Sequence, residues 1–230
     1  MKKCGSIPAD VRQIVGSALA ISVAVGVFAV SFGVVSVASG ASVMQTCALS
    51  LFVFTGASQF SAVSVIGAGG SVASALGGSL LLAARNSVYG LSLAPTLQGS
   101  LGKRLLAAHF VIDETTALAS AHDDLRLRRW AFWSCAICLY VFWNIGTLIG
   151  ALVGNSIDPE TYGLDAAFPV VFTAMIVPHL RTRNGRRAAL FGAIASASLA
   201  PFLPIGLPIL VATLGILFGV SPSKSGAEIK

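Results

Sequence analysis

The sequence contains no charged side chain and no histidine between Gln13 and Ala84. Charged residues make up only 10% of the chain, whereas soluble proteins carry roughly 25%. An apolar run of this length is too long to be the core of a soluble domain, so the sequence excludes a soluble protein. Because about 20 residues cross a bilayer, the run is long enough for three crossings. It lacks the polar/apolar alternation of membrane barrel strands, so the sequence predicts membrane-spanning helices.

Known catalytic motifs are also missing. The sequence has no P-loop, no H-E-x-x-H, no G-x-S-x-G and no dinucleotide fingerprint. Its polar loops are too short for a separate catalytic domain, so we expect no enzyme, no cofactor and no metal site. The net charge of +6 does not indicate a nucleic-acid partner. The positive charges lie in short loops and tails, where the positive-inside rule of membrane proteins places them.

Cysteines are few, and their spacing does not form a disulfide framework; they are Cys4, Cys47, Cys135 and Cys138. Cys135 and Cys138 form a C-x-x-C motif, but it lies within an apolar run rather than beside a redox or zinc pattern. We interpret both as small helix-packing residues, with metal or redox chemistry as the weaker alternative.

The distribution of apolar residues predicts an all-α, polytopic membrane protein. Residues 13–220 are expected to form one transmembrane domain between a basic tail, residues 1–12, and a C-terminal tail, residues 221–230. The expected spans are residues 13–39, 42–66, 71–97, 105–120, 130–154, 168–180 and 188–220. Three prolines divide the last segment, which forms either one span or two short helices joined by a proline-rich hairpin. The expected count is therefore seven or eight, and we favour eight.

The arginines indicate the orientation of these spans. Clusters at residues 123–129 and 181–187 predict cytoplasmic loops, on the same side as the N-terminus, and the acidic residues 155–165 predict an external one. This topology requires residues 105–120 to cross the membrane despite their charges. It also leaves Lys103 and Arg104 outside, against the usual bias.

Three charged residues lie within predicted spans: Arg85, Asp113 and Glu114. Each costs about 2.5–3.5 kcal/mol near the bilayer centre, so each needs a partner, water or a function. In one interpretation Arg85 and one of the carboxylates form a structural ion pair. In the other, Arg85 binds a substrate carboxylate, while an acidic residue pairs with a substrate ammonium or carries a proton. His109, four residues before Asp113, is expected on the same helix face, as a proton relay or only a helix-end residue.

A polar interruption at residues 55–59 predicts a broken helix within the second span. In transporters, such breaks lie at mid-membrane, and the freed helix N-termini face anionic substrate groups. In the alternative interpretation, Ser58 and Gln59 only form hydrogen bonds between helices. Asn144 is interpreted as such a packing residue.

Glycines recur every fourth residue near the end of the fifth predicted span, at Gly146, Gly150 and Gly154. They leave one helix face bare, which predicts a close contact with a neighbouring helix of this chain or of a partner.

The polar residues within the spans resemble motifs of the AzlC family, the large subunit of bacterial branched-chain amino acid exporters. The matching stretches are residues 54–60 (FTGASQF), residues 84–92 (ARNSVYGLS) and the pair Asp113-Glu114. The resemblance covers roughly residues 18–160. It implies a secondary transporter of the bacterial inner membrane that exports valine, leucine, isoleucine or similar amino acids and is driven by the proton gradient. It also implies a small AzlD-type membrane subunit as partner.

The physical argument predicts a substrate site formed by Gly56, Ala57, Ser58, Gln59, Arg85, Asn86 and Tyr89. The residues expected to couple transport to protons are Asp113, Glu114 and His109. We expect the broken segment, Arg85 and at least one carboxylate to converge near mid-membrane. The rival hypotheses are a channel, which would need rings of like residues around a pore, and a structural subunit held by a scaffold ion pair. A membrane-embedded enzyme with Asp113 and Glu114 as an acid/base pair is the remaining rival, but no nucleophile or metal-ligand set accompanies them.

Overall fold

The computed structural model describes residues 9–154, 156, 161, 163, 166, 170, 173, 176–177, 179–205 and 207–215. All regular structure within these residues is helical, as the sequence predicted. The external loop expected at residues 155–165 and the span expected at residues 168–180 lie mostly outside the described residues. Residues 1–8 and 216–230, which include the C-terminal tail and Cys4, lie wholly outside them.

Two long parallel helices form the centre of the molecule, α1 (Ala9–Ala38) and α7 (Leu125–Gly154). Both are long and apolar enough to cross a membrane. A Cβ atom added at Gly146 would meet the carbonyl oxygen of Gly26, and one added at Gly150 would meet that of Val30. One added at Gly154 would lie 3.0 Å from the Cα of Val34. The predicted glycine contact is therefore confirmed, and it is internal.

We expect Gly150→Ala to destabilise the protein because the new methyl group has no space beside the α1 backbone. Overpacking of this kind costs about 1–3 kcal/mol. Gly16→Ala is the matched control on α1, since nothing lies within 4 Å of its added Cβ, and it should be neutral or stabilising by up to about 1 kcal/mol. Thermal unfolding in detergent measures both. Equal melting temperatures for the two variants would contradict the contact.

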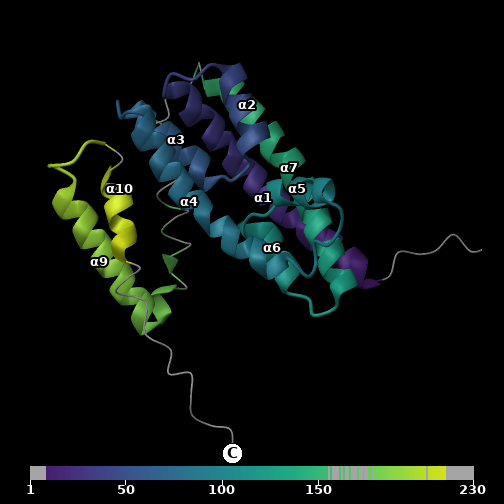
Figure 1. The fold of residues 1–230 in the computed structure, drawn as a ribbon. Coiled ribbons are helices and arrows are strands. Elements are labelled where there is room, and N and C mark those ends of the chain that lie inside the picture. The colour runs from purple at the N-terminus through teal and green to yellow at the C-terminus, as the bar shows by residue number, and fades with distance from the viewer. Residues whose placement is uncertain are drawn as a thin grey trace, which may run out of the picture.

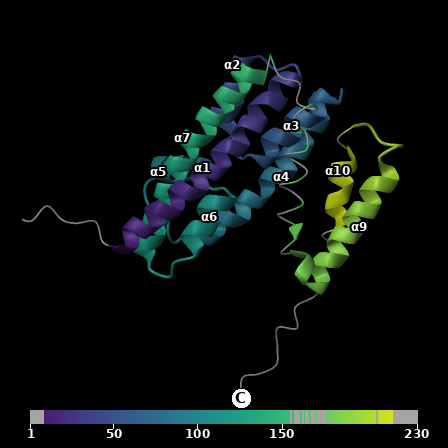
Figure 2. The same cartoon turned by 180° about the vertical axis from the view of Figure 1, so that it is seen from behind.

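Helices α2 (Val43–Val53) and α3 (Ala57–Gly67) form a hairpin rather than the single crossing predicted for residues 42–66. Ser36, near the end of α1, hydrogen-bonds Thr46 at the start of α2 (2.8 Å). Gly67, the last residue of α3, lies against Ser39. Both outer ends of the hairpin therefore lie beside the same end of α1 (Figures 1 and 2). Each arm rises about 16 Å, half of a hydrocarbon core of roughly 30 Å.

After this hairpin, α4 (Val72–Leu93) runs the full length of the bundle, antiparallel to α1. It ends beside the start of α7, where Arg129 donates a hydrogen bond from Nε to the carbonyl oxygen of Thr96 (2.9 Å). Although α4 has 22 residues, enough for a crossing, Arg85 and Asn86 make it more polar than α1 and α7.

Helices α5 (Leu101–His109) and α6 (Asp113–Ser120) form a second hairpin, which enters from the opposite end of the bundle. The continuous span predicted for residues 105–120 is therefore wrong. Thr115 accepts a hydrogen bond from the backbone N–H of Ile112 (3.1 Å) and donates one to the carbonyl oxygen of Phe110 (2.7 Å). These bonds fix a turn at residues 110–112, and the acidic side chains after it suit the positive end of the α6 dipole.

The second hairpin changes two further predictions. His109 and Asp113 do not share a helix face, because one ends α5 and the other begins α6. Lys103 and Arg104, in the first turn of α5, lie at the same end of the bundle as Arg128 and Arg129, not at the opposite end. The four basic residues therefore lie at one end of the bundle, so the sequence-based expectation that separated them is not supported.

The chain between α2 and α7 repeats one motif in opposite directions: a hairpin of two short helices, then a long helix. Within residues 9–154, where the sequence predicted five crossings, the structure has three long helices, α1, α4 and α7. The predicted count of seven or eight spans is thus not supported by the residues the structure describes. Two of these helices, α1 and α7, meet both the length and the composition of a membrane span.

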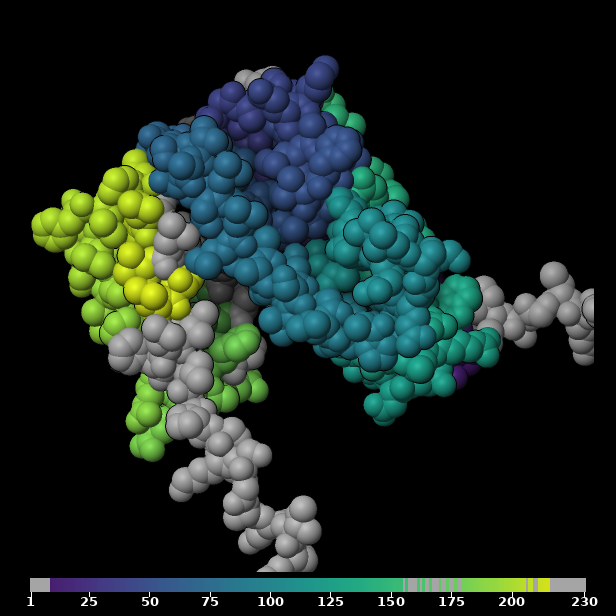
Figure 3. Space-filling model, in the orientation of Figure 1, coloured from purple at the N-terminus to yellow at the C-terminus, as the bar shows by residue number. Residues whose placement is uncertain are grey.

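The C-terminal part forms a lobe beside α4 (Figure 3). It consists of η1 (His179–Arg181), α9 (Arg183–Leu199), α10 (Leu207–Ala212) and η2 (Thr213–Gly215). Gly192 of α9 packs against Ala212, and Gly215 packs against Ala188, so the two helices run antiparallel. Of the two arrangements predicted for residues 188–220, the described part matches the pair of short helices with a proline-rich turn.

A partly buried hydrogen bond at Asn144 joins α2 to α7. Ser50 donates to Oδ1 of Asn144 (2.8 Å), and the Asn144 side-chain NH₂ donates to the carbonyl oxygen of Tyr140 (2.8 Å). Asn144 is therefore the packing residue that the sequence predicted. Many large apolar side chains on the outside of α1, α4, α7 and α9 are exposed, including Val27, Leu80, Leu91, Ile137 and Leu190. Such a surface is typical of a protein in contact with lipid or partner helices.

Candidate functional site: a pocket between two hairpin tips

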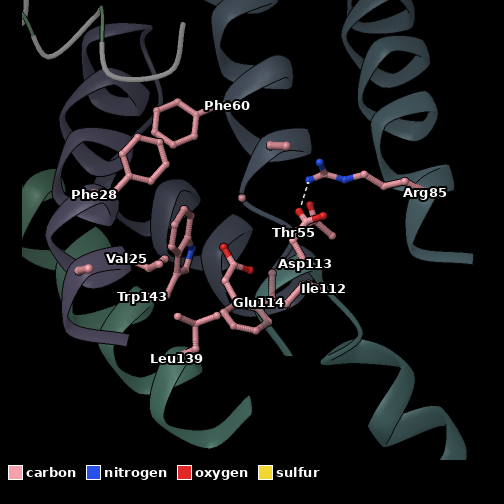
Figure 4. A pocket seen from close by; sticks show the side chains of 14 residues that line it. Val25, Phe28, Thr55, Phe60, Arg85, Ile112, Asp113, Glu114, Leu139 and Trp143 are labelled. Carbon is pink, nitrogen blue, oxygen red and sulfur yellow. Dashed lines mark ion pairs between the residues drawn. The ribbon is translucent and has the colours of Figure 1, made fainter. Parts of the chain in front are cut away.

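The tips of the two hairpins meet at a pocket of about 260 Å³ in the middle of the bundle. Residues 54–57 of the first tip and residues 112–114 of the second line it, together with side chains from α1, α3, α4 and α7 (Figure 4). The remaining lining residues are Ala24, Val25, Phe28, Phe60, Arg85, Leu139 and Trp143. The expected convergence of the broken segment, Arg85 and a carboxylate is present in the structure.

The first tip is shaped by two residues with positive φ, Phe54 (22°) and Gly56 (57°). A glycine adopts such values at little cost, whereas Phe54 is strained and is held by burial. The Gln59 side chain, which is fully buried, stabilises the turn. Its Oε1 accepts a hydrogen bond from the backbone N–H of Gly56 (3.1 Å), and its Nε2 donates one to the carbonyl oxygen of Leu49 (2.8 Å).

Only part of the predicted substrate site at this tip faces the pocket. Gly56 and Ala57 line it, but Ser58 and Gln59 do not. Ser58 is buried and its carbonyl oxygen accepts a hydrogen bond from Ser79 of α4 (2.9 Å). The amide of Gln59 already bonds backbone groups, so this side chain supports the site rather than contacting a ligand.

Arg85 forms an ion pair with Asp113, the first residue of α6, with Nη2 2.7 Å from Oδ2. Tyr89, one turn further along α4, donates a hydrogen bond to the other carboxylate oxygen of Asp113 (2.6 Å). The side chains of the ion pair are about one quarter exposed, at 26% and 24%. Of the predicted α4 residues, Arg85 lines the pocket, Tyr89 acts on Asp113, and Asn86 does neither.

Glu114 points in another direction from Asp113, because adjacent helical residues are rotated by about 100°. Its carboxylate is directed into the pocket towards Trp143 (Figure 4). The only ion pair among the described residues is that of Arg85 with Asp113, so Glu114 has no cationic partner there. The two adjacent acids thus occupy different environments.

The rest of the pocket wall is aromatic and apolar. The rings of Phe28 and Phe60 stack at 4.9 Å, and Trp143 lies 6.2 Å from Phe28. The sequence did not reveal Phe28, Phe54 or Trp143 as site residues. An aromatic side chain in an apolar run has no distinguishing signal, although the neighbouring Asn144 marks a polar position on α7.

His109 lies outside the pocket. Its ring stacks against Phe54 (5.9 Å) and meets Tyr140 edge-on (5.8 Å). It therefore lies behind the first tip, separated from the pocket by Phe54. In the described part of the chain, His, Cys, Asp and Glu side chains do not form a group arranged to hold a metal ion.

The pocket has the chemistry of a small-ligand site, with a mostly apolar wall and a few polar groups on one side. Its volume lies somewhat below the roughly 300–1,000 Å³ of sites for drug-sized ligands, so it suits a smaller molecule. The charged groups at the second tip suit a polar, ionic end of that molecule. The aromatic wall suits an apolar end.

Comparison with known proteins gives one family. The model of the AzlC protein family matches residues 20–157, which include every residue that lines the pocket. The branched-chain amino acid transport protein AzlC of Bacillus subtilis is 24% identical over 208 residues, covering 87% of this chain and 81% of that protein.

Two further relatives are named as membrane proteins. An uncharacterized membrane protein of Helicobacter pylori is 29% identical over 176 residues, covering 75% of this chain and 77% of the relative. The inner membrane protein YgaZ of Escherichia coli is 29% identical over 182 residues, or 74% of each chain. No solved structure matches this chain.

Proposed function

Because the chain belongs to the AzlC family, we propose that it is a secondary transporter that exports branched-chain and similar apolar amino acids. It would lie in the bacterial cytoplasmic membrane as a multi-pass protein, use the proton gradient and act with a small AzlD-type membrane subunit. Catalysis plays no part in this proposal. The names of the B. subtilis and E. coli relatives support the transport of branched-chain amino acids and the inner-membrane location, respectively.

One observation carries the proposal: two hairpins enter the bundle from opposite ends, and their tips meet at a single pocket. Secondary transporters place substrate and coupling ions at such breaks near the bilayer midplane, between elements of inverted orientation. Here α3 and α6 both begin at the pocket, where Arg85, Asp113 and Glu114 supply charge. An isolated set of charges would be costly at this depth, so their convergence favours a site.

The two hairpins predict a membrane topology that differs at two loops from the one predicted from the sequence. Ala68, between α3 and α4, should lie outside, and Lys103 should lie inside with Arg126. In a background without native cysteines, an impermeant thiol reagent applied from the periplasmic side should label Ala68→Cys and miss Lys103→Cys. Arg126→Cys, which is inside in both topologies, is the control. The reverse labelling of the first two positions would contradict the hairpins.

The structural-subunit hypothesis has one observation in its favour. Arg85, Asp113 and Tyr89 bond one another and fix α4 to α6, as a scaffold would. A scaffold does not need a pocket, however, and it does not use Glu114, which is outside this network. The Arg85 variants described in the Discussion separate the two roles.

Flux in proteoliposomes tests the proposed function. The chain and its small partner are reconstituted together, and leucine movement is followed with and without a proton gradient. We expect saturable flux that falls when an ionophore removes the gradient, with empty liposomes as the control. Flux proportional to leucine concentration without saturation would indicate a channel, and no flux would indicate a structural subunit.

A further inference from the structure

Trp143 carries a buried hydrogen-bond donor that the structure leaves without a protein partner. The side chain is 3% exposed and lines the pocket. Its Nε1 has no hydrogen-bond partner among the described residues. The indole N–H is only a donor, and an unsatisfied buried donor is costly enough to be rare in proteins. A donor of this kind on a pocket wall indicates an acceptor that arrives with a ligand.

Glu114 supplies an acceptor that lines the same pocket. Figure 4 shows its carboxylate directed towards the Trp143 indole from the second hairpin tip. The other carboxylate of the pocket, Asp113, already accepts hydrogen bonds from Arg85 and Tyr89. The pocket wall therefore presents one unsatisfied donor, on α7, and one anionic acceptor, on α6.

We infer that Trp143 and Glu114 together bind the backbone of a free α-amino acid. The indole N–H donates to the substrate carboxylate, and Glu114 accepts from the substrate ammonium. These two substrate groups are attached to one carbon, so they match a donor and an acceptor that face the same small pocket. The inference rests on the proposed function and deepens it, because it names the side chains that recognise the amino-acid backbone.

The rest of the pocket sets the side-chain preference. With its backbone at Trp143 and Glu114, the substrate directs its side chain towards Phe28, Phe60 and Val25, all apolar. A buried methylene contributes only about 0.8 kcal/mol of transfer free energy, so valine, leucine and isoleucine should differ little. Molecules that lack the ammonium or the carboxylate should be rejected much more strongly, because they leave a buried group unpaired.

Binding to the wild-type protein tests the substrate class without any substitution. The purified complex is titrated with L-leucine, N-acetyl-L-leucine, 4-methyl-2-oxopentanoate and 3-methylbutylamine, and binding is followed by calorimetry. We expect each analogue to bind at least about tenfold more weakly than leucine. N-acetyl-L-leucine binding as tightly as leucine would overturn the role of Glu114. 3-Methylbutylamine doing so would overturn recognition of the carboxylate.

A pair of matched variants tests the indole N–H itself. Trp143→Phe keeps an aromatic ring but removes the donor, and should weaken leucine binding by about tenfold or more. Trp133→Phe makes the same change on α7 outside the pocket, where Trp133 packs against Phe110 and Phe132. It should bind leucine like the wild type. Intrinsic fluorescence should respond to leucine in Trp133→Phe and lose that response in Trp143→Phe.

The outcomes distinguish this inference from the proposed function. If the wild type carries and binds leucine while Trp143→Phe binds it with unchanged affinity, the inference is wrong and the function stands. If the wild type neither binds nor carries leucine, the proposed function itself has failed.

Discussion

Replacing Arg85 with alanine should abolish amino-acid flux. The change leaves the Asp113 carboxylate at the pocket with Tyr89 as its remaining partner in the described structure, and it removes the positive charge of the site. Because the side chains of this ion pair are about one quarter exposed, breaking it should cost less than the roughly 3–5 kcal/mol of a fully buried pair. Arg85→Lys should not restore full flux, because an ammonium lacks the planar fork that bonds Asp113 while presenting further donors to the pocket.

The double variant Arg85→Ala/Asp113→Asn decides between the site and the scaffold. With both charges removed, no unpaired charge remains, so folding should recover. If Arg85 also serves the substrate, flux should stay near background. Leucine flux in proteoliposomes and thermal unfolding in detergent measure the two effects separately. Recovery of both folding and transport would leave the ion pair as scaffolding only.

Sequence patterns located the first hairpin tip and the charged residues but not their arrangement. Gly56 and its polar neighbours identified the break, since such residues interrupt an apolar helix. They did not reveal that the chain reverses direction there, because a kinked crossing and a hairpin have the same composition. That difference depends on the positive φ of Phe54, which no sequence rule assigns to a phenylalanine.

The second tip was missed for a related reason. Residues 110–112 are apolar, so nothing in their composition suggests a turn. The available signal was the pair of acids that follows, since acidic residues favour the first turn of a helix. The other signal was that the predicted topology placed Lys103 and Arg104 outside, against the positive-inside rule. Each hairpin replaces one predicted crossing, and there are two hairpins. Two lost crossings leave α7 in its predicted orientation, so the topology predicted for α7 is compatible with the structure.

Within the predicted site, the structure separates residues that the sequence grouped together. Arg85, Gly56 and Ala57 line the pocket, whereas Gln59 and Tyr89 hold the groups that do. Such a division depends on side-chain direction, which polarity alone does not specify. The aromatic wall, by contrast, consists of residue types that a sequence treats as core or lipid-facing surface.

Of the three residues expected to couple transport to protons, Glu114 should be the one that matters. Asp113 is engaged by Arg85 and Tyr89, and His109 lies behind Phe54 among aromatic rings. Among the described residues, the charged or titratable groups that interact electrostatically with Glu114 come from α4, α6 and α7; they are Arg85, Tyr89, Asp113 and Cys135. Helices α2 and α3 contribute no charged side chain.

Glu114→Gln should therefore remove the effect of a proton gradient on leucine flux, while His109→Gln should leave it intact. A proton and a substrate ammonium compete for the Glu114 carboxylate, so the protein carries either a proton or an amino acid at this site, but not both at once. That exclusion makes protons entering the cell drive amino acids out, and it makes leucine binding weaken as the pH falls. The measurement is gradient-driven leucine flux at saturating leucine, with a pH-sensitive dye reporting proton movement and Asp123→Asn as the surface control. Coupling that persists in Glu114→Gln but disappears in His109→Gln would assign the proton to the histidine and require a path past Phe54.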